Sequence, residues 1–368
     1  MQKNYRIGVI GHTGRGNYGH GIDRVWLDMP DCEIVAVADE HADGLAAALK
    51  RLKVSQGYSD YRKMLDKAKP DIVAVAPRWI DQHRDMVVAA AERGMHVYME
   101  KPFCRTLEEA DQIVAACEKH RIKLAIAHQT RYSPRLHVVR RLLEEGAIGK
   151  VLEFRGRGKE DRRGGGEDLW VLGSHIMNLI HHLGGQPKWC CGHVLQDGQP
   201  ITSQHVQPGA EGIGPLAGDT VAAMYAMDDH VTAYFGSHRN VAGERLGRFG
   251  LQIYGSEGII EVLTGHLPPM HILRDSRWSP GRSEHRWLPI TSAGVDQPEP
   301  LTDHGLHGGN LLACHDLLAA IEEDRFPECN VYEARMTVAM IAAVFESHRV
   351  DARVPMPLQT RQNPLELL

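Results

Sequence analysis

The stretch that decides the fold is RIGVIGHTGRGNYG, which runs from Arg6 to Gly19. It opens with a short apolar, β-branched run and continues into a literal G-x-G-x-x-G at Gly14, Gly16 and Gly19. Glycines there let the backbone turn tightly and approach a pyrophosphate that sits on a helix N-terminus. Because the glycines follow the first expected strand and precede an expected helix, we predict a dinucleotide-binding loop rather than a plain glycine-rich turn.

The alignment of this loop with the fingerprint stays open. The first glycine of the fingerprint usually abuts the strand, and in this sequence that residue is Gly11. Counted from Gly11, Thr13 stands where the second glycine is expected, and the loop has gained residues. The expected cofactor contacts in the loop are Gly11, His12, Thr13, Gly14 and Gly16.

An acidic residue ends the second expected strand. Asp39 follows Ala38 and lies 20 residues after Gly19 and 28 after Gly11. A carboxylate there accepts hydrogen bonds from an adenosine ribose and repels a 2′-phosphate, so we predict NAD rather than NADP. Asp39 could also be a helix N-cap, and the two roles are compatible.

Apolar runs alternate with helical spacing through the first third of the chain. Runs that are apolar on both faces are typical of buried parallel strands. A capping box of the S/T-x-x-E type opens one helix at Thr106–Glu109. We therefore predict a doubly wound α/β Rossmann domain over residues 1–126. The expected strands are Arg6–Ile10, Ile34–Ala38, Ile72–Ala76, His96–Met99 and Lys123–Ala127.

After residue 126 the pattern of apolar and polar residues changes. Alternating strand patterns predict an α+β domain over residues 127–368, with a large open, mostly antiparallel sheet. Long loops at 156–166 and 264–310 interrupt it and are expected to be functional. The expected elements are strands Val151–Arg157, Thr220–Met227, Val231–Ser237 and Leu251–Tyr254 and helices Asn310–Glu323 and Glu333–Ser347.

Composition limits the partners. With 42 basic and 47 acidic residues, a net charge of −5 and no basic stripe, the chain is expected to bind neither nucleic acid nor a membrane. Seven cysteines without a C-x-x-C indicate reduced cytoplasmic thiols, and a strand expected at Arg6 leaves no room for a signal peptide. The 22 histidines include no H-x-x-x-H or HExxH, so no metal is expected.

Two charges and a proline end the strand His96–Met99, in the run Glu100-Lys101-Pro102. In open α/β sheets ligands bind at that edge. A partly desolvated lysine beside a nicotinamide would have a lowered pKa and could move protons. The alternative is a surface Glu–Lys pair, which contributes little.

The Glu-Lys-Pro run resembles that of the glucose–fructose oxidoreductase / inositol dehydrogenase (Gfo/Idh/MocA) family of sugar and polyol dehydrogenases. The resemblance spans nearly the whole chain. Pro77 with His83 resembles the family's P-x(5)-H, and Arg131–Pro134 resembles its R-[YF]-x-P. Residues 145–150 resemble its E-G-x-I-G-K link, and residues 255–258 resemble its G-[ST]-x-G turn.

This resemblance implies hydride transfer between a sugar or cyclic polyol hydroxyl and NAD, with Lys101 and His175 as catalytic residues. In the family's D-x-G-x-H, Gly173 and His175 match, but Val171 stands in place of the aspartate and Asn178 in place of a further acid. Asp168 could substitute, two helical turns before His175, or could be an N-cap. The implied further cofactor contacts are Pro77, His83, Glu100, Lys101 and Gln129, and the implied substrate contacts are Arg131, Asp168, Trp170 and His175.

Other readings stay open. Some relatives oxidise a sugar transiently and act as NAD-retaining lyases or glycosidases, and a non-catalytic dinucleotide- and sugar-binding protein is a third possibility. His181 and His182 are expected to be structural, and His304 and His307 to border the pocket. An open sheet with an uncovered face needs a partner, and relatives pair through it, so a homodimer or homotetramer is expected.

Overall fold

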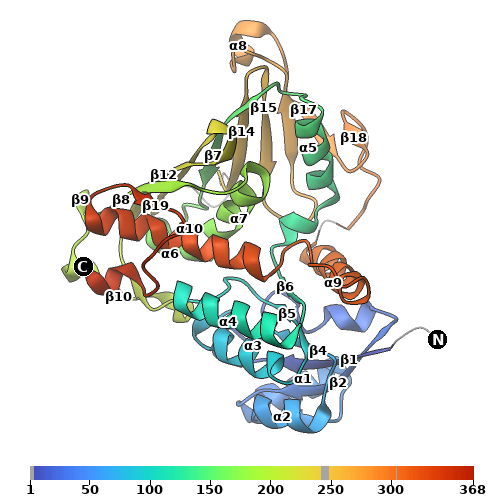
Figure 1. Ribbon diagram of the computed structural model, residues 1–368. Coiled ribbons are helices and arrows are strands. Elements are labelled where there is room, and N and C mark those ends of the chain that lie inside the picture. The colour runs from blue at the N-terminus through green and yellow to red at the C-terminus, as the bar shows by residue number, and fades with distance from the viewer. Residues whose placement is uncertain (1–3, 242–247, 304) are drawn as a thin grey trace. The chain divides into compact units, whose positions relative to one another are not determined.

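The computed structural model describes residues 4–241, 248–303 and 305–368 and divides into two compact units (Figure 1). The first comprises residues 1–128, 210–214 and 306–335, and the second comprises residues 129–209, 215–305 and 336–368. Residues 210–214 and 306–335 therefore belong to the first unit, whereas a single division after residue 126 would place them in the second domain. Each unit has its own sheet and its own core.

The first unit is built on a parallel sheet of six strands in the order β3-β2-β1-β4-β5-β6, which is the doubly wound dinucleotide-binding order. All four residues of β4 are buried, as expected for a strand covered on both faces. The strands are β1 (Tyr5–Ile10), β2 (Cys32–Ala38), β3 (Gly57–Tyr58), β4 (Ile72–Val75), β5 (His96–Met99) and β6 (Leu124–Ile126).

Helices pack on this sheet. Thr106 caps α4 by accepting a hydrogen bond from Glu109 N at 3.2 Å. The Glu109 carboxylate accepts from Arg105 N at 2.9 Å, one residue before the position that a full capping box uses. The helices are α1 (Ala42–Leu52), α2 (Tyr61–Ala68), α3 (His83–Ala91), α4 (Leu107–His120) and α9 (Leu306–Glu322), with 3-10 helices η1 (Val25–Asp28) and η2 (Ile80–Gln82).

The second unit is built on an eleven-stranded sheet in the order β18-β17-β16-β15-β14-β7-β13-β12-β8-β19, with β9 beside β8. Its pairs are antiparallel except β7 with β13, which confirms the expected fold class. The strands are β7 (Val151–Arg157), β8 (Trp189–Gln196), β9 (Gln199–Pro200), β12 (Thr220–Ala226), β13 (Thr232–His238), β14 (Gly250–Gly255), β15 (Gly258–Leu263), β16 (Met270–Leu273), β17 (Leu288–Thr291), β18 (Gly294–Val295) and β19 (Val354–Pro355); β10 (Gln207–Pro208) and β11 (Pro215–Leu216) form a separate pair.

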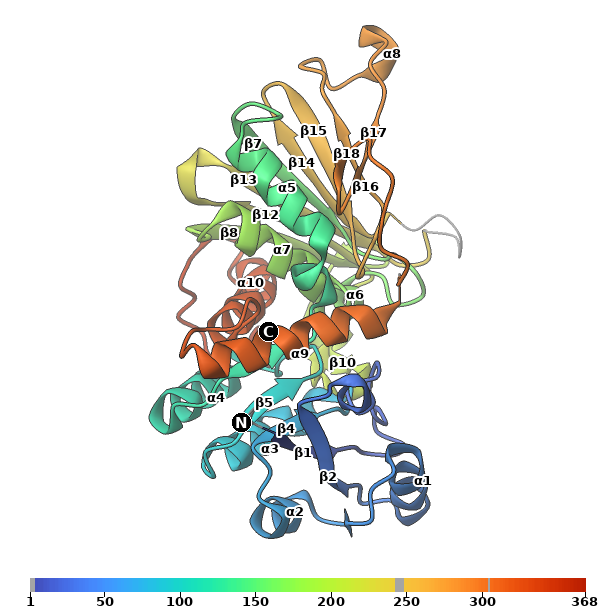
Figure 2. The same cartoon turned by 90° about the vertical axis from the view of Figure 1, so that its right-hand side faces the viewer.

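Helices cover one face of this sheet and leave the other open (Figure 2). A Cβ at Gly156 in β7 would lie 2.4 Å from Ile176, and one at Gly192 in β8 would lie 2.4 Å from the Val344 carbonyl oxygen. Glycine at these two positions therefore lets the helices approach the strands closely. The helices of this unit are α5 (Pro134–Glu144), α6 (Gly166–Val171), α7 (Gly173–Gly184), α8 (Pro280–Ser283) and α10 (Val331–Val350), which begins in the first unit.

Candidate active site

The C-terminal ends of four parallel strands bring most of the expected cofactor residues to one edge of the first unit. Gly11 follows β1, Asp39 follows β2, Pro77 comes two residues after β4, and Glu100 follows β5. In a doubly wound sheet this edge is where ligands bind. The two strands beside the change of direction in strand order, β1 and β4, carry the glycine loop and Pro77.

The glycine loop folds as a series of turns, and the expected helix after it is wrong. Residues 13–16 and 18–24 form turns, with a bridge between His12 and Asn17, and the four-residue 3-10 helix η1 follows. The cause is the backbone: Gly14, Gly16 and Gly19 have φ of +84°, +86° and +61°, and Asn17 has +54°. Left-handed residues cannot continue a right-handed helix, so no helix N-terminus faces a pyrophosphate here.

The loop closes on itself and on the neighbouring strand end. His12 N and Asn17 N each bond across the turn between these two residues at 3.0 Å, and Gly14 N donates to Asn17 Oδ1 at 3.0 Å. A Cβ at Gly16 would lie 2.4 Å from Arg78 N, so the loop rests on the segment after β4. Around Gly14 a Cβ would meet nothing within 4 Å, so this part of the loop has room for a ligand.

Asp39 is buried, and its carboxylate bonds to the chain. It accepts from Thr13 N at 3.1 and 3.2 Å, Thr13 Oγ1 at 2.7 Å, Tyr18 Oη at 2.9 Å and His41 N at 2.9 Å. Burial raises the pKa of the Asp39 carboxyl, but these hydrogen bonds outweigh burial and leave its pKa below the ordinary value. Asp39 is not the N-cap of α1, because that residue is His41. These contacts favour a structural role for Asp39.

Glu100 lies beneath the loop, fully buried. It accepts hydrogen bonds from His20 N at 2.6 Å, His20 Nδ1 at 2.7 Å and Lys101 N at 3.0 Å. Burial alone raises the pKa of Glu100, and the bonds from His20 with the charge of Lys101 reverse this and lower it. A Cβ at Gly19 would lie 2.5 Å from Glu100 Cγ. Glu100 therefore fixes the loop from below, and Lys101, 7% exposed, comes directly after it.

His83 joins the segments that follow β4 and β5. Its ring is fully buried, with Nε2 2.7 Å from the Pro77 carbonyl oxygen and Nδ1 2.9 Å from that of Pro102. The structure thus brings Pro77, His83 and Pro102 together, next to Lys101. The ring sets the spacing of two backbone segments at the ligand edge.

Sequence reasoning missed Asn310 of α9. Its side chain accepts from Tyr98 Oη at 2.8 Å and donates to the His20 carbonyl oxygen at 3.0 Å. A fully buried asparagine thus links β5 to the glycine loop. The only signal was a polar residue in a run that is otherwise apolar, which is too common to identify a site. His307 pairs with Asp28 at 2.9 Å, and His304 lies outside the described residues.

In the second unit, Arg131 and Asn178 belong to one buried polar cluster. Arg131 Nη1 donates to Asn178 Oδ1 at 3.0 Å, and Asn178 Nδ2 donates to Thr337 Oγ1 at 3.2 Å. Burial, with the positive charges of Arg131 and Arg140, lowers the pKa of His182 to about 2. Asn178 therefore accepts a hydrogen bond from Arg131, at a position where the family resemblance implies an acidic residue. Gln129 precedes this cluster in a 3-10 helix and is buried.

Asp168 and His175 lie on different helices, because the expected continuous helix breaks at Leu172 between α6 and α7. Asp168 is not an N-cap, since Gly165 holds that position. Its buried carboxylate accepts from Lys159 N at 3.2 Å, Glu160 N at 3.0 Å and Ser237 Oγ at 2.5 Å, which favours a structural role.

His175 is half-buried and meets Phe249 edge-on, with ring centroids 6.2 Å apart. Trp170 is buried, 2% exposed, and lies in α6. Val171, in place of the family's aspartate, is also buried. Lys101 belongs to the first unit and His175 to the second.

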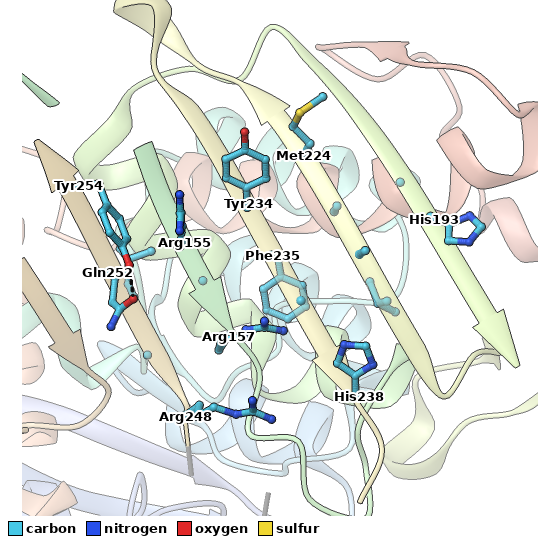
Figure 3. Close-up of a pocket in the computed structure, with 18 of the residues that line it drawn as sticks. Arg155, Arg157, His193, Met224, Tyr234, Phe235, His238, Arg248, Gln252 and Tyr254 are labelled. Carbon is cyan, nitrogen blue, oxygen red and sulfur yellow. Dashed lines mark hydrogen bonds between the residues drawn. The ribbon is translucent and has the colours of Figure 1, made fainter. Parts of the chain in front are cut away.

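A hollow on the open face of the large sheet contains none of the expected site residues. Arg155, Met224, Tyr234, Gln252 and Tyr254 stand on this face, on four different strands (Figure 3). Within the described residues, no group of three His, Cys, Asp or Glu is placed to hold a metal ion. No described helix has the length and apolar character needed to cross a bilayer.

Residues 5–128 match the oxidoreductase family with an NAD-binding Rossmann fold, and residues 136–261 match the GFO/IDH/MocA C-terminal domain. The chain belongs to the Gfo/Idh/MocA family. It is an NAD-dependent oxidoreductase. In the first unit, the turn at Gly14 after β1 has open space around it, and Lys101 is buried at the end of β5.

Several similar proteins are named as sugar or polyol dehydrogenases. Levoglucosan dehydrogenase of Pseudarthrobacter phenanthrenivorans is 26% identical, over 96% of this chain and 99% of that protein. D-apiose dehydrogenase of Paraburkholderia graminis is 34% identical over 37% of this chain and 36% of that protein. The structure of levoglucosan dehydrogenase with NADH and L-sorbose has a TM-score of 0.78 at 21% identity, covering 97% and 100% of the two chains, and shows the same fold.

Proposed function

We propose that this protein oxidises a hydroxyl of a sugar or cyclic polyol to a carbonyl with NAD. The observation that carries the proposal is Lys101, buried at the end of β5 directly after Glu100, which fixes the glycine loop. A binding-only site gains little from burying an amine at that edge, whereas a buried amine there can serve as a general acid or base. The names of the similar proteins, levoglucosan dehydrogenase and D-apiose dehydrogenase, support a carbohydrate substrate.

Bound NAD supplies the acceptor for a hydride that leaves the substrate carbon. The chain's own part is to receive the hydroxyl proton, for which we assign Lys101 Nζ and His175. As the C–H bond breaks with its electron pair, the O–H proton passes to one of these groups and a C=O bond forms. Arg131 and Trp170 are proposed substrate contacts. Gly11, His12, Thr13, Gly14, Gly16, Pro77 and Gln129 are proposed cofactor contacts.

The test is a panel of sugars and polyols offered with NAD while the absorbance of the reduced cofactor is followed. Levoglucosan, D-apiose and inositols come first, because similar proteins carry those names. Stoichiometric NADH with at least one substrate is expected. Cleavage of a glycosidic bond without accumulating NADH would instead indicate the transient-oxidation chemistry, for which the Val171 position is the only sequence feature.

We further propose that copies of this chain pair through the open face of the large sheet and that the protein works in the cytoplasm. Tyr234 is 38% exposed on that face, beside Met224, and Tyr254 lies on the same face two strands away (Figure 3). Aromatic and methionine side chains are enriched in protein interfaces. All seven cysteines lie in described residues and no disulfide joins any two of them, which fits a reducing compartment.

A further inference from the structure

The carboxylate expected to bind the adenosine ribose is already saturated by the chain. Oδ2 of Asp39 accepts from Thr13 N, Thr13 Oγ1 and Tyr18 Oη, and Oδ1 accepts from Thr13 N and His41 N. A carboxylate offers about four lone-pair sites, and these donors occupy them. Asp39 is also only 2% exposed. Two ribose hydroxyls would find neither an acceptor nor space there.

Packing around Thr13 keeps Asp39 covered. A Cβ at Gly44, in the first turn of α1, would lie 2.0 Å from Thr13 Oγ1, so Thr13 is held between that turn and Asp39. On the other side, a Cβ at Gly11 would lie 2.2 Å from the Tyr18 ring. The Arg51 guanidinium lies 4.6 Å from the centre of the same ring. Exposing Asp39 would require the whole glycine loop to move.

The next residue, Glu40, has the opposite environment. Its side chain is 63% exposed, and its Oε2 lies 4.0 Å from Nε2 of His12 in the glycine loop. His41 is the N-cap of α1, so Glu40 lies outside the helix at the C-terminal edge of the sheet. An exposed carboxylate beside the glycine loop has the charge and the acceptors that an adenosine ribose requires.

We propose that Glu40, not Asp39, accepts the adenosine ribose hydroxyls and disfavours a 2′-phosphate, while Asp39 holds the glycine loop closed. This assignment rests on the proposed NAD-dependent function. In this assignment two neighbouring acidic residues have separate roles: Glu40 binds the ribose, and Asp39 forms the hydrogen bonds that hold the glycine loop. Glu40 is then the position that sets cofactor preference, and Asp39 sets the stability of the loop.

The test is direct titration of the full-length protein with NADH and with NADPH, following the fluorescence of the bound reduced cofactor, together with the melting temperature of the cofactor-free protein. The variants are Glu40→Gln, Glu40→Arg and Asp39→Asn. Asp43→Asn is the matched control, because it removes the same charge from an exposed residue in the first turn of α1. Binding and melting are read without turnover, so substrate choice does not enter.

Glu40→Gln is expected to weaken NADH binding about tenfold, as for a lost charged hydrogen-bond acceptor, with an unchanged melting temperature. Glu40→Arg should bind NADPH more tightly than the unmodified protein does, and Asp43→Asn should change neither affinity. Asp39→Asn should lower the melting temperature by roughly 5 °C because buried donors lose their acceptor.

An unchanged NADH-to-NADPH preference in both Glu40 variants would overturn the assignment, as would an Asp39→Asn protein that melts normally but loses the preference. Those results leave the dehydrogenase function intact, provided that the unmodified protein binds NADH. If the unmodified protein bound neither cofactor, both the assignment and the proposed function would fail.

Discussion

At the C-terminal edge of the parallel sheet, buried polar side chains form hydrogen bonds with backbone atoms of neighbouring segments. Glu100, Asp39 and His83 are buried; Glu100 and Asp39 accept hydrogen bonds from the backbone of the glycine loop, and His83 bonds to the carbonyl oxygens of Pro77 and Pro102. Buried polar groups cost free energy unless they are satisfied, so these residues specify one arrangement of the loops. Because these loops are already ordered, a ligand that binds at this edge loses less free energy to the ordering of the protein.

His182, in the second unit, should make the free energy of unfolding depend on pH. The folded-state pKa of His182 is lowered to about 2, from an ordinary value of 6.5, by burial beside Arg131 and Arg140, with His181 and His137 adding smaller effects. Below pH 6.5 the unfolded chain binds a proton there and the folded chain does not. His182 should therefore reduce the free energy of unfolding by up to about 1.4 kcal/mol per pH unit as pH falls from 6.5.

The measurement is urea unfolding between pH 6.5 and 5.5, because below about pH 5.5 the unfolded chain begins to protonate Glu100 and then Asp39, whose folded-state pKa values are lowered, and both add to the slope. His182→Gln should flatten the dependence in that window. His285→Gln, at an exposed position, should follow the unmodified protein. Parallel curves for all three proteins would contradict the assigned pKa shift.

At the scale of elements, the glycine loop and the break between α6 and α7 position the site residues. The loop replaces the helix that usually follows β1, and the break at Leu172 separates Asp168 from His175. In both places backbone geometry decides the outcome: left-handed glycines end helical continuation in the loop, and the bonds from Lys159, Glu160 and Ser237 hold Asp168 in place.

Two glycines of the loop make a matched pair. Gly14 and Gly16 have φ of +84° and +86°, but only at Gly16 would a Cβ meet backbone, at 2.4 Å from Arg78 N. Gly14→Ala should cost only the left-handed strain, roughly 1–2 kcal/mol of unfolding free energy. Gly16→Ala should cost at least twice as much, because backbone atoms cannot move aside as a side chain does. Equal losses in urea titrations of the two variants would show that the loop does not rest on residues 78–79.

Strand positions were largely predictable from sequence, whereas loop geometry was not. The runs at Arg6–Ile10, His96–Met99 and Val151–Arg157 correspond to β1, β5 and β7 within one residue, because burial on one or both faces leaves a direct mark on composition. The loop glycines were visible, but their φ angles were not, so a helix was expected after Gly19. The partners of Asp39 could not be predicted, because they depend on three-dimensional contacts with Tyr18 and Thr13.

At the scale of the whole molecule, the uncovered face of the large sheet should govern assembly. If copies pair there, Tyr234→Asp places a charge within the interface and should shift the protein toward monomer in sedimentation velocity. Phe326→Asp is the control, since Phe326 is 58% exposed but belongs to the first unit. If Tyr234→Asp and the unmodified protein sedimented alike as the same oligomer, this face would not be the interface.

The most direct test of the central claim is the rate of NADH formation by Lys101→Met with the best substrate of the panel. Methionine keeps the length and apolar stem of lysine but cannot take a proton. The kcat of Lys101→Met should fall about 10²–10⁴-fold, as for loss of general acid–base catalysis, while its NADH affinity measured by titration stays within a factor of a few. A variant that binds NADH and turns over at the unmodified rate would contradict the catalytic role of Lys101.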